Sequence, residues 1–270
     1  MKKGRFDKKL YIILFFIAIV IQPGSAVSET INIYTYHNHP PFVTGEAKGL
    51  SYDLLNMLNE KAGDSYNFAL HVIPRSRLNL ITRNWHDGDC PDPEKNCEDN
   101  WIVLWVNPLW GFGKDPMKTC YYIPILNDSN SIISRIEHKL EYSKPESLIG
   151  LKFGGMLGHK YVGIDDLAQK GLITRIDGTK ERDNIFKLIK KRVDIILLPT
   201  STIQYFVSKD EIISKHASEL YIAPTKHQEY RRNFMVPITR VDIIKFLESV
   251  DLSSDIWKAS LRNAGLLKGD

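Results

Sequence analysis

The stretch "RVDIILLPTSTIQYFV" (residues 192–207) carries the strongest indication of the fold. Asp194 is followed by four apolar residues and then by Pro199. A short apolar run without alternation is typical of a strand buried on both faces. Proline lacks the N–H that a ladder needs, so Pro199 should end the strand, and Thr200, Ser201 or Thr202 should cap a helix. Ligands bind at the carboxyl edge of open α/β sheets, so this strand end predicts a ligand site.

Strands and helices alternate on both sides of this stretch. Alternating or apolar runs predict strands at 30–38, 66–74, 100–108, 130–136, 151–155, 173–178, 193–199 and 219–225, and an extended segment at 231–239. Helical spacing predicts helices at 50–63, 77–85, 163–172, 179–192, 240–252 and 253–267. This order predicts the α/β class, with mainly parallel sheets and helical crossovers.

The first 26 residues have the composition of a secretory signal peptide. The basic segment "MKKGRFDKK" precedes the apolar run "LYIILFFIAIVI", and "GSA" supplies the small residues of a cleavage site after Ala26. The apolar run is short for a membrane span, although an uncleaved anchor is the alternative. We therefore expect export to the periplasm.

Removal of this leader leaves a chain without net charge. Five of the 36 Lys and Arg residues and one of the 32 Asp and Glu residues lie in the leader, which leaves 31 of each sign. Neither nucleic acid nor an anionic membrane surface is indicated as a partner.

Export also determines how the three cysteines are interpreted. Cys90 and Cys97 enclose a loop rich in Pro, Asp and Asn, and a disulfide between them is favoured in an oxidising compartment. Cys120 would then remain as a buried thiol. A metal site at the neighbouring aspartates is the alternative, but no zinc or calcium spacing supports it, so neither a metal nor a cofactor is expected.

Five motifs in order resemble the bacterial extracellular solute-binding proteins of family 3, the polar amino-acid receptors of ABC importers. They are "INIYTYHNHPPF" (31–42), "GLSYDLLNMLNEKAG" (49–63), "SLIGLKFGGMLGHKY" (147–161), the opening stretch (192–207) and "SDIWKASLRNAGL" (254–266). The resemblance implies two α/β lobes joined by two crossing strands, near 127–135 and 225–237. It implies a leader at 1–26, a first lobe from 27–130 with 229–270, and a second lobe from 131–228.

The chain departs from the family at the positions that bind a free α-amino acid. The acid that holds the ammonium in such members corresponds to Pro199 here. The carboxylate-binding Arg is missing from "NPLWGFGKDPMK" (107–118), and an acid of the first strand is replaced by Tyr36. The resemblance therefore implies the same scaffold with a different ligand or different anchors.

Other residues are candidates for the ligand anchors, each with a structural alternative. Arg77, and after it Arg75, could hold an anion, or both could be surface residues. Trp110 and Phe112 could stack on a ligand or pack in the core. The turn of Gly158, His159 and Lys160 could bind an anion through its N–H groups or simply cap a helix. The remaining candidates are Tyr36, His39 and Thr200.

The leading functional hypothesis is a monomeric periplasmic protein that captures a small polar solute for an inner-membrane ABC permease. A sensor module would use the same lobes, and the sequence does not separate the two. A dehydratase acting on prephenate-like acids is a third hypothesis. It requires a cleft carboxylic acid, and only Glu46 at the rim and a distant Glu181 are available. No nucleophile or metal motif indicates other enzyme chemistry.

Overall fold

The computed structural model describes residues 28–90, 97–113 and 115–267. The expected leader at 1–26 lies outside these residues. Within the described ranges, no helix is both long and apolar enough to span a membrane.

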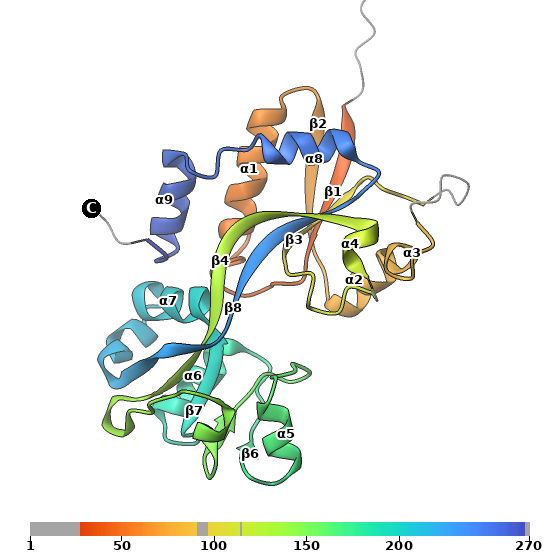
Figure 1. Cartoon of the computed structure of the whole chain (residues 1–270). Coiled ribbons are helices and arrows are strands. Elements are labelled where there is room, and N and C mark those ends of the chain that lie inside the picture. The colour runs from red at the N-terminus through yellow and green to blue at the C-terminus, as the bar shows by residue number, and fades with distance from the viewer. Residues whose placement is uncertain (1–27, 91–96, 114, 268–270) are drawn as a thin grey trace, which may run out of the picture.

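The strands and helices alternate along most of the chain (Figure 1). The strands are β1 (Glu29–Thr35), β2 (Tyr66–Val72), β3 (Trp101–Val106), β4 (Cys120–Arg135), β5 (Lys152–Gly154), β6 (Thr174–Arg175), β7 (Ile195–Pro199) and β8 (Leu220–Pro237). The helices are α1 (Leu50–Ala62), α2 (Arg75–Ile81), α3 (Arg83–His86), α4 (Pro116–Thr119), α5 (Ile164–Gln169), α6 (Glu181–Ile189), α7 (Thr200–Lys209), α8 (Val241–Glu248) and α9 (Asp255–Asn263). Short 3-10 turns lie at Ile136–His138, Pro145–Leu148 and Ile213–Glu219.

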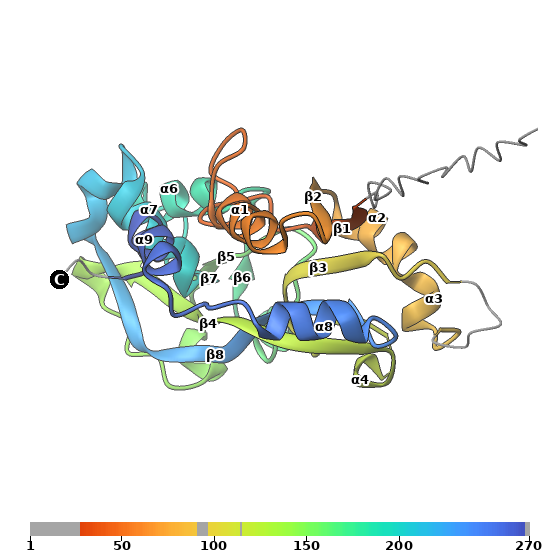
Figure 2. The ribbon, with the colours of Figure 1, turned by 90° about the horizontal axis from the view of Figure 1, so that it is seen from above.

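The described strands form one eight-stranded sheet in the order β2-β1-β3-β8-β4-β7-β5-β6. β1 is parallel to β2 and β3, and β5 is parallel to β6 and β7. The long strands β4 and β8 are antiparallel to each other and to their outer neighbours. Two parallel α/β units are therefore joined by an antiparallel pair, which passes from one part of the molecule to the other (Figures 1 and 2).

The hydrophobic cores divide along the same line. One core combines N-terminal residues such as Ile33 and Leu54 with the C-terminal Trp257 and Leu261. Two further clusters cover the faces of the β5–β7 unit and draw on residues between 132 and 223. We call the first part lobe 1 and the second lobe 2. The predicted two-lobe fold with two crossing strands is confirmed, whereas the residue boundaries of the lobes remain a prediction.

The stretch at 192–207 forms the predicted strand and helix with a different cap. Ile195 to Leu198 are fully buried in β7, and α7 begins directly after Pro199. None of the three hydroxyls caps the helix. Instead, the Asp128 carboxylate on β4 accepts hydrogen bonds from Ser201 N (3.0 Å) and Ser201 Oγ (2.7 Å). The acceptor for the first turn of α7 therefore comes from a crossing strand.

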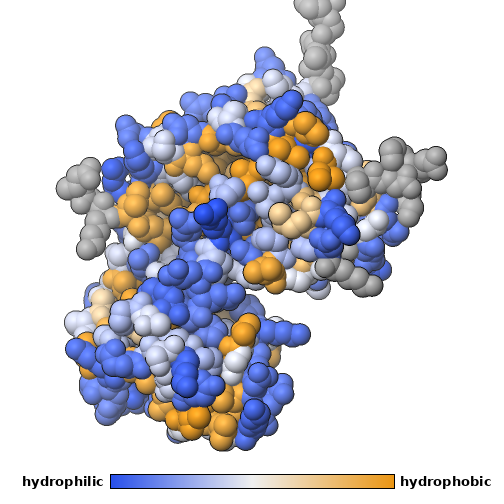
Figure 3. Space-filling model, in the orientation of Figure 1, coloured by the Kyte–Doolittle hydropathy of each residue, from blue (hydrophilic) through white to orange (hydrophobic). Residues whose placement is uncertain are grey.

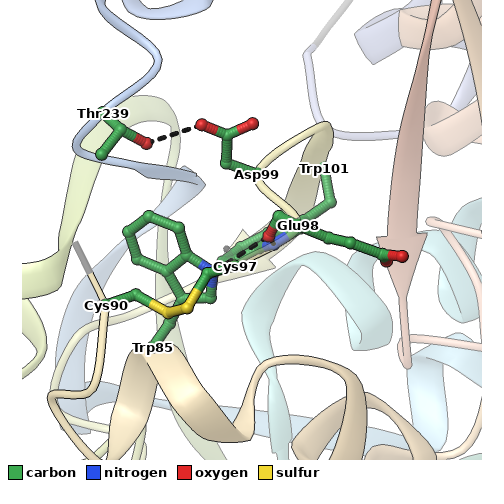
Figure 4. The surroundings of a disulfide bond; sticks show 7 residues. All are labelled: Trp85, Cys90, Cys97, Glu98, Asp99, Trp101 and Thr239. Atoms are coloured by element: carbon green, nitrogen blue, oxygen red, sulfur yellow. Dashed lines mark hydrogen bonds between the residues drawn. A yellow bond between two sulfur atoms is a disulfide. The ribbon is translucent and has the colours of Figure 1, made fainter. Parts of the chain in front are cut away.

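The predicted disulfide between Cys90 and Cys97 is confirmed (Figure 4). It lies beside Trp85 and Trp101, whose indole N–H groups both donate to the Glu98 carbonyl at 3.0 Å. In a chain-entropy picture, closing so short a loop stabilises the fold by roughly 2–3 kcal/mol.

The third cysteine differs from this pair in its reactivity. Cys120 is a buried free thiol, and burial raises its pKa to about 12. Because only the thiolate is nucleophilic, iodoacetamide should leave Cys120 unmodified in the native protein and modify it after denaturation. Non-reducing peptide mapping of the same sample should show Cys90 linked to Cys97. Rapid native alkylation of Cys120, or a peptide linking it to either partner, would contradict the assignment.

The segment after α9 lies against lobe 2. Gly265 has a φ of +73°, and a Cβ at this position would overlap the Ser208 hydroxyl and approach Gln204 O of α7 to 3.4 Å. Figures 1 and 2 both place α9 beside α7. Since Trp257 and Leu261 of α9 belong to the core of lobe 1, this segment is a further contact between the lobes.

Candidate functional site

His39 connects the two lobes. It lies in the loop after β1, where its Nδ1 is 3.0 Å from Pro40 O. The same Nδ1 is 3.4 Å from Thr202 Oγ1 on α7, and its Nε2 is 3.9 Å from Glu181 Oε1 at the start of α6. The side chains of His39 and Glu181 are only 14% and 13% exposed, so this contact is largely shielded from water.

His37 lies behind His39 and is buried, with 8% of its surface exposed. Its Nδ1 is 3.4 Å from His39 Nε2, and the rings of Tyr36, Phe42 and Trp110 surround it. Burial lowers the pKa of His37 well below its usual value, and the positive charge of Arg232 lowers it further. Its Nε2 is buried and has no hydrogen-bond partner among the described residues.

An ion pair between the crossing strands supports this cluster. Arg232 on β8 donates from Nε to Asp128 Oδ2 on β4 at 2.7 Å, and both side chains are 1% exposed. The guanidinium also lies over the rings of Phe42, Trp110 and Tyr230. The pair therefore holds the aromatic residues of lobe 1 next to the crossing strands.

Arg75 lies on the lobe 1 side, at the start of α2. Its Nη2 donates to Trp110 O at 2.8 Å, and its Nε donates to Asn79 Oδ1 at 2.8 Å. Its guanidinium stacks on Phe112, 3.9 Å from the ring centroid, and lies 4.9 Å from that of Tyr36. No acidic side chain among the described residues pairs with Arg75, so it is a fixed positive charge beside the cluster.

Thr200 takes part in a hydroxyl network on the crossing strands. Its Oγ1 lies 2.5 Å from Ser129 Oγ and 2.7 Å from Ser131 Oγ. Lys226 Nζ donates to Ser131 Oγ at 3.1 Å. A groove of ≈ 590 Å³ runs along this region between α7, the crossing strands and Leu266. The groove includes Thr200 and Tyr230, but its lining does not include the histidines.

The structure brings some of the predicted residues together and separates others. Tyr36, His39, Arg75 and Trp110 converge on one cluster. Phe112 is fully buried beneath Arg75, so it supports the guanidinium from the core. Arg77, the first choice for an anion anchor, is exposed, and its charge acts on Tyr34 instead.

The turn at Gly158, His159 and Lys160 does not precede a helix directly. α5 begins only at Ile164, after Gly163. The turn lines a hollow of ≈ 520 Å³ with Arg175, whose guanidinium is already paired with Asp165 (2.6 Å) and Asp177 (2.7 Å). A further anion therefore finds little uncompensated charge there. His159 itself lies within electrostatic reach of Glu181 and His39.

Several residues of the cluster were not predicted from the sequence: His37, Asp128, Glu181, Thr202, Tyr230 and Arg232. Glu181 was expected to be distant, but the fold brings its Oε1 to 3.9 Å from His39 Nε2. "RRNF" did contain the buried Arg232, but a double Arg gives no sign of which member faces inward. No group of three or more metal-ligating side chains occurs in the part of the chain that the structure describes.

Comparisons with known proteins identify the fold. No family model and no curated protein matches the sequence. Solved structures match over most of the chain. An ancestral arginine-binding protein bound to arginine superposes with a TM-score of 0.59 at 14% identity, covering 88% of this chain and 98% of that one.

The chain has the two-lobe periplasmic-binding-protein fold.

Two further matches share this fold. The holo form of ArgBP from T. maritima gives a TM-score of 0.54 at 17% identity, covering 87% of this chain and 95% of that one. An ancestral amino-acid-binding protein, described as a precursor of cyclohexadienyl dehydratase, gives 0.57 at 14% identity, with 87% and 94% covered. In this fold the cluster around His39 lies where the two lobes meet. On the face that Figure 3 shows, hydrophilic side chains lie at the centre of the junction between the lobes, with hydrophobic ones to either side.

Proposed function

We propose that this chain is a periplasmic binding protein that captures a small polar solute between its lobes and delivers it to an ABC permease. The observation that carries the proposal is the shielded contact of His39 in lobe 1 with Thr202 and Glu181 in lobe 2. A solute held there touches both lobes only when they are closed, and this difference in affinity shifts the equilibrium toward the closed form. Export through the leader and a monomeric state belong to the same proposal.

We propose further that the solute is not an ordinary α-amino acid. Pro199 occupies the position of the acid that would hold an α-ammonium group. No Arg that could hold an α-carboxylate occurs between residues 107 and 118. Arg75 is the group best placed to bind an anionic part of the solute, because its guanidinium is fixed beside Tyr36 and Trp110. This geometry favours Arg75 over the exposed Arg77.

The two arginines form a matched pair for testing the anion site. Native mass spectrometry of freshly purified protein should identify a co-purified solute, and its binding should raise the melting temperature by mass action. Arg75→Ala should weaken binding of an anionic solute by at least about 30-fold, because a charged, desolvated partner is lost.

The control is Arg77→Ala, which should change affinity by less than about threefold, as expected for an exposed side chain. Equal losses in the two variants would contradict the assignment. Micromolar binding of glutamine, histidine or arginine by the wild type would overturn the exclusion of ordinary amino acids.

A dehydratase is the second candidate, and Glu181 is the observation that favours it. This carboxylate lies beside His39, where the two lobes meet, and a dehydratase would need its acid catalyst between the lobes. Incubation of the purified protein with prephenate tests this candidate directly. Product formation that is lost in Glu181→Gln would favour the enzyme, whereas an unchanged substrate favours the binding protein.

A further inference from the structure

Two hydrogen-bond acceptors near the contact between the lobes have no hydrogen-bond donor among the described residues. The first is His37 Nε2 in lobe 1, which is buried and unpartnered. The second is the Glu181 carboxylate in lobe 2, whose side chain is 13% exposed and whose Oε1 lies 3.9 Å from His39 Nε2, beyond hydrogen-bond range. A buried polar atom without a partner costs free energy, so His37 Nε2 calls for a group that satisfies it.

The hydrogen-bond chain through the histidines determines that His37 Nε2 is an acceptor. Pro40 O can only accept, so His39 Nδ1 carries the proton of that 3.0 Å contact. Neutral His39 then presents a lone pair at Nε2, and His37 Nδ1 must donate to it across 3.4 Å. Neutral His37 therefore has no proton on Nε2.

Both histidines are held in the neutral state that this chain requires. Burial is the main cause that lowers the pKa of each ring. Arg232, His39, His159 and Arg75 face His37, and each of them lowers the pKa of its ring further. His39 faces Glu181 and Asp128, which oppose its pKa decrease, and Arg232, which adds to it.

The charges around the cluster leave Glu181 as the uncompensated acid. Asp128 is already paired with Arg232, and four hydrogen bonds saturate its carboxylate. The guanidinium of Arg75 is turned toward main-chain carbonyls and Asn79 rather than toward an acid. The rings of Tyr36, Trp110 and Tyr230 already have the guanidinium groups of Arg75 and Arg232 over them.

We propose that the bound solute carries a cationic nitrogen group, an ammonium, amidinium or guanidinium, whose N–H groups bind Glu181 from lobe 2 and His37 Nε2 from lobe 1. This inference rests on the proposed solute-binding function and deepens it. Glu181, on α6, would replace the acid that is missing at Pro199. The imidazole of His37 would be the second acceptor for the same cationic group. The cationic group would thereby bridge the lobes and favour closure.

The first experiment uses pairs of probes that differ only in the charged group. ω-Guanidino acids from guanidinoacetate to 5-guanidinopentanoate are compared with their ω-ureido isosteres, and ω-amino acids with ω-hydroxy acids. All of these probes keep a carboxylate that Arg75 could bind. The longer members have no α-ammonium group, so they test a cation at the far end of the solute. At least one cationic member should bind in isothermal titration and exceed its neutral partner by about 10-fold or more.

The second experiment assigns this difference to Glu181. In Glu181→Gln the cationic probe should lose its advantage over the neutral isostere, while Glu211→Gln, at an exposed position, should retain it. Equal binding of both members of a pair by the wild type overturns the proposal. So does a solute, identified by native mass spectrometry, that has no cationic nitrogen, although that result would leave the binding function intact.

The third measurement is independent of any added solute. In protein labelled with ¹⁵N-histidine, the His37 signals are identified by their loss in His37→Phe. At neutral pH the Nε2 of unliganded wild type should show the shift of an unprotonated, pyridine-type nitrogen. A protonated Nε2 would overturn the assigned acceptor. If no cationic probe binds, the proposed solute class is wrong, whatever the spectrum shows.

Discussion

Asp128→Ala is expected to lower the free energy of unfolding by about 3–5 kcal/mol, because it leaves a fully buried charge without its partner. Asp128 accepts hydrogen bonds from Arg232 Nε, Ser201 N, Ser201 Oγ and Ser129 N. Without this carboxylate, the Arg232 guanidinium, whose side chain is 1% exposed, has no counter-ion. The first turn of α7 also loses its hydrogen-bond acceptor. For a chain of this size the melting temperature should fall by roughly 6–20 °C.

Thermal unfolding followed by circular dichroism measures this effect. The control is Asp115→Ala, which removes an exposed ion pair with Lys118 and should change the melting temperature little. A double change, Asp128→Leu with Arg232→Met, removes both charges and should recover part of the loss. If Asp128→Ala and Asp115→Ala have the same melting temperature, the ion pair of Asp128 with Arg232 contributes nothing to the stability of the crossing strands.

Trp105→Ala should have a similarly large effect, about 3–5 kcal/mol, because it opens a cavity in the core of lobe 1. The Trp105 side chain is fully buried, stacks with Trp257 at 6.4 Å between centroids, and donates from Nε1 to Ser51 Oγ at 2.8 Å. Its φ of +67° lies where the register of β3 and β8 shifts between Val103 and Val106. Its carbonyl also accepts a hydrogen bond from Arg232 Nη1 at 3.3 Å.

Urea denaturation tests this expectation against Trp110→Ala. Trp110 is half-buried at the cleft, so its truncation should cost much less stability and act mainly on solute binding. Similar midpoints for the two variants would show that the core of lobe 1 does not depend on Trp105.

The elements that follow local hydrophobic patterns could be predicted from the sequence. The buried run in β7 and the apolar face of α1, with Leu50, Leu54 and Leu58 at spacings of four, are two such cases. β4 was different, because the hydrophobic pattern predicted a strand only from residue 130 and the resemblance implied a crossing only from 127, whereas the strand begins at Cys120. Its first half contains Pro124, Asn127 and Asp128, which are residues typical of turns, and pairing with β8 overrides their preference. For the same reason, two separate predicted segments proved to be the single strand β8.

The candidate site could be predicted only where its residues lie at the end of a recognisable element. Tyr36 and His39 follow the first strand, and Arg75 follows the second, so the topology alone places them at the cleft. Glu181 and Arg232 enter through contacts between segments distant in the sequence, which no local pattern encodes. Which of Arg75 and Arg77 faces the candidate site depends on which face of α2 is turned inward. A helix of one or two turns has too weak a hydrophobic periodicity to predict this face.

The close approach of Gly265 to α7 has an evolutionary consequence. A side chain at position 265 would require the hydroxyl of Ser208 to move, and these two positions belong to different lobes. Descendants of this protein should therefore not change position 265 alone. Glycine at position 208 would remove the overlap but not the φ of +73°, which L-residues rarely adopt, so position 265 should remain glycine and record the lobe contact in sequence alignments.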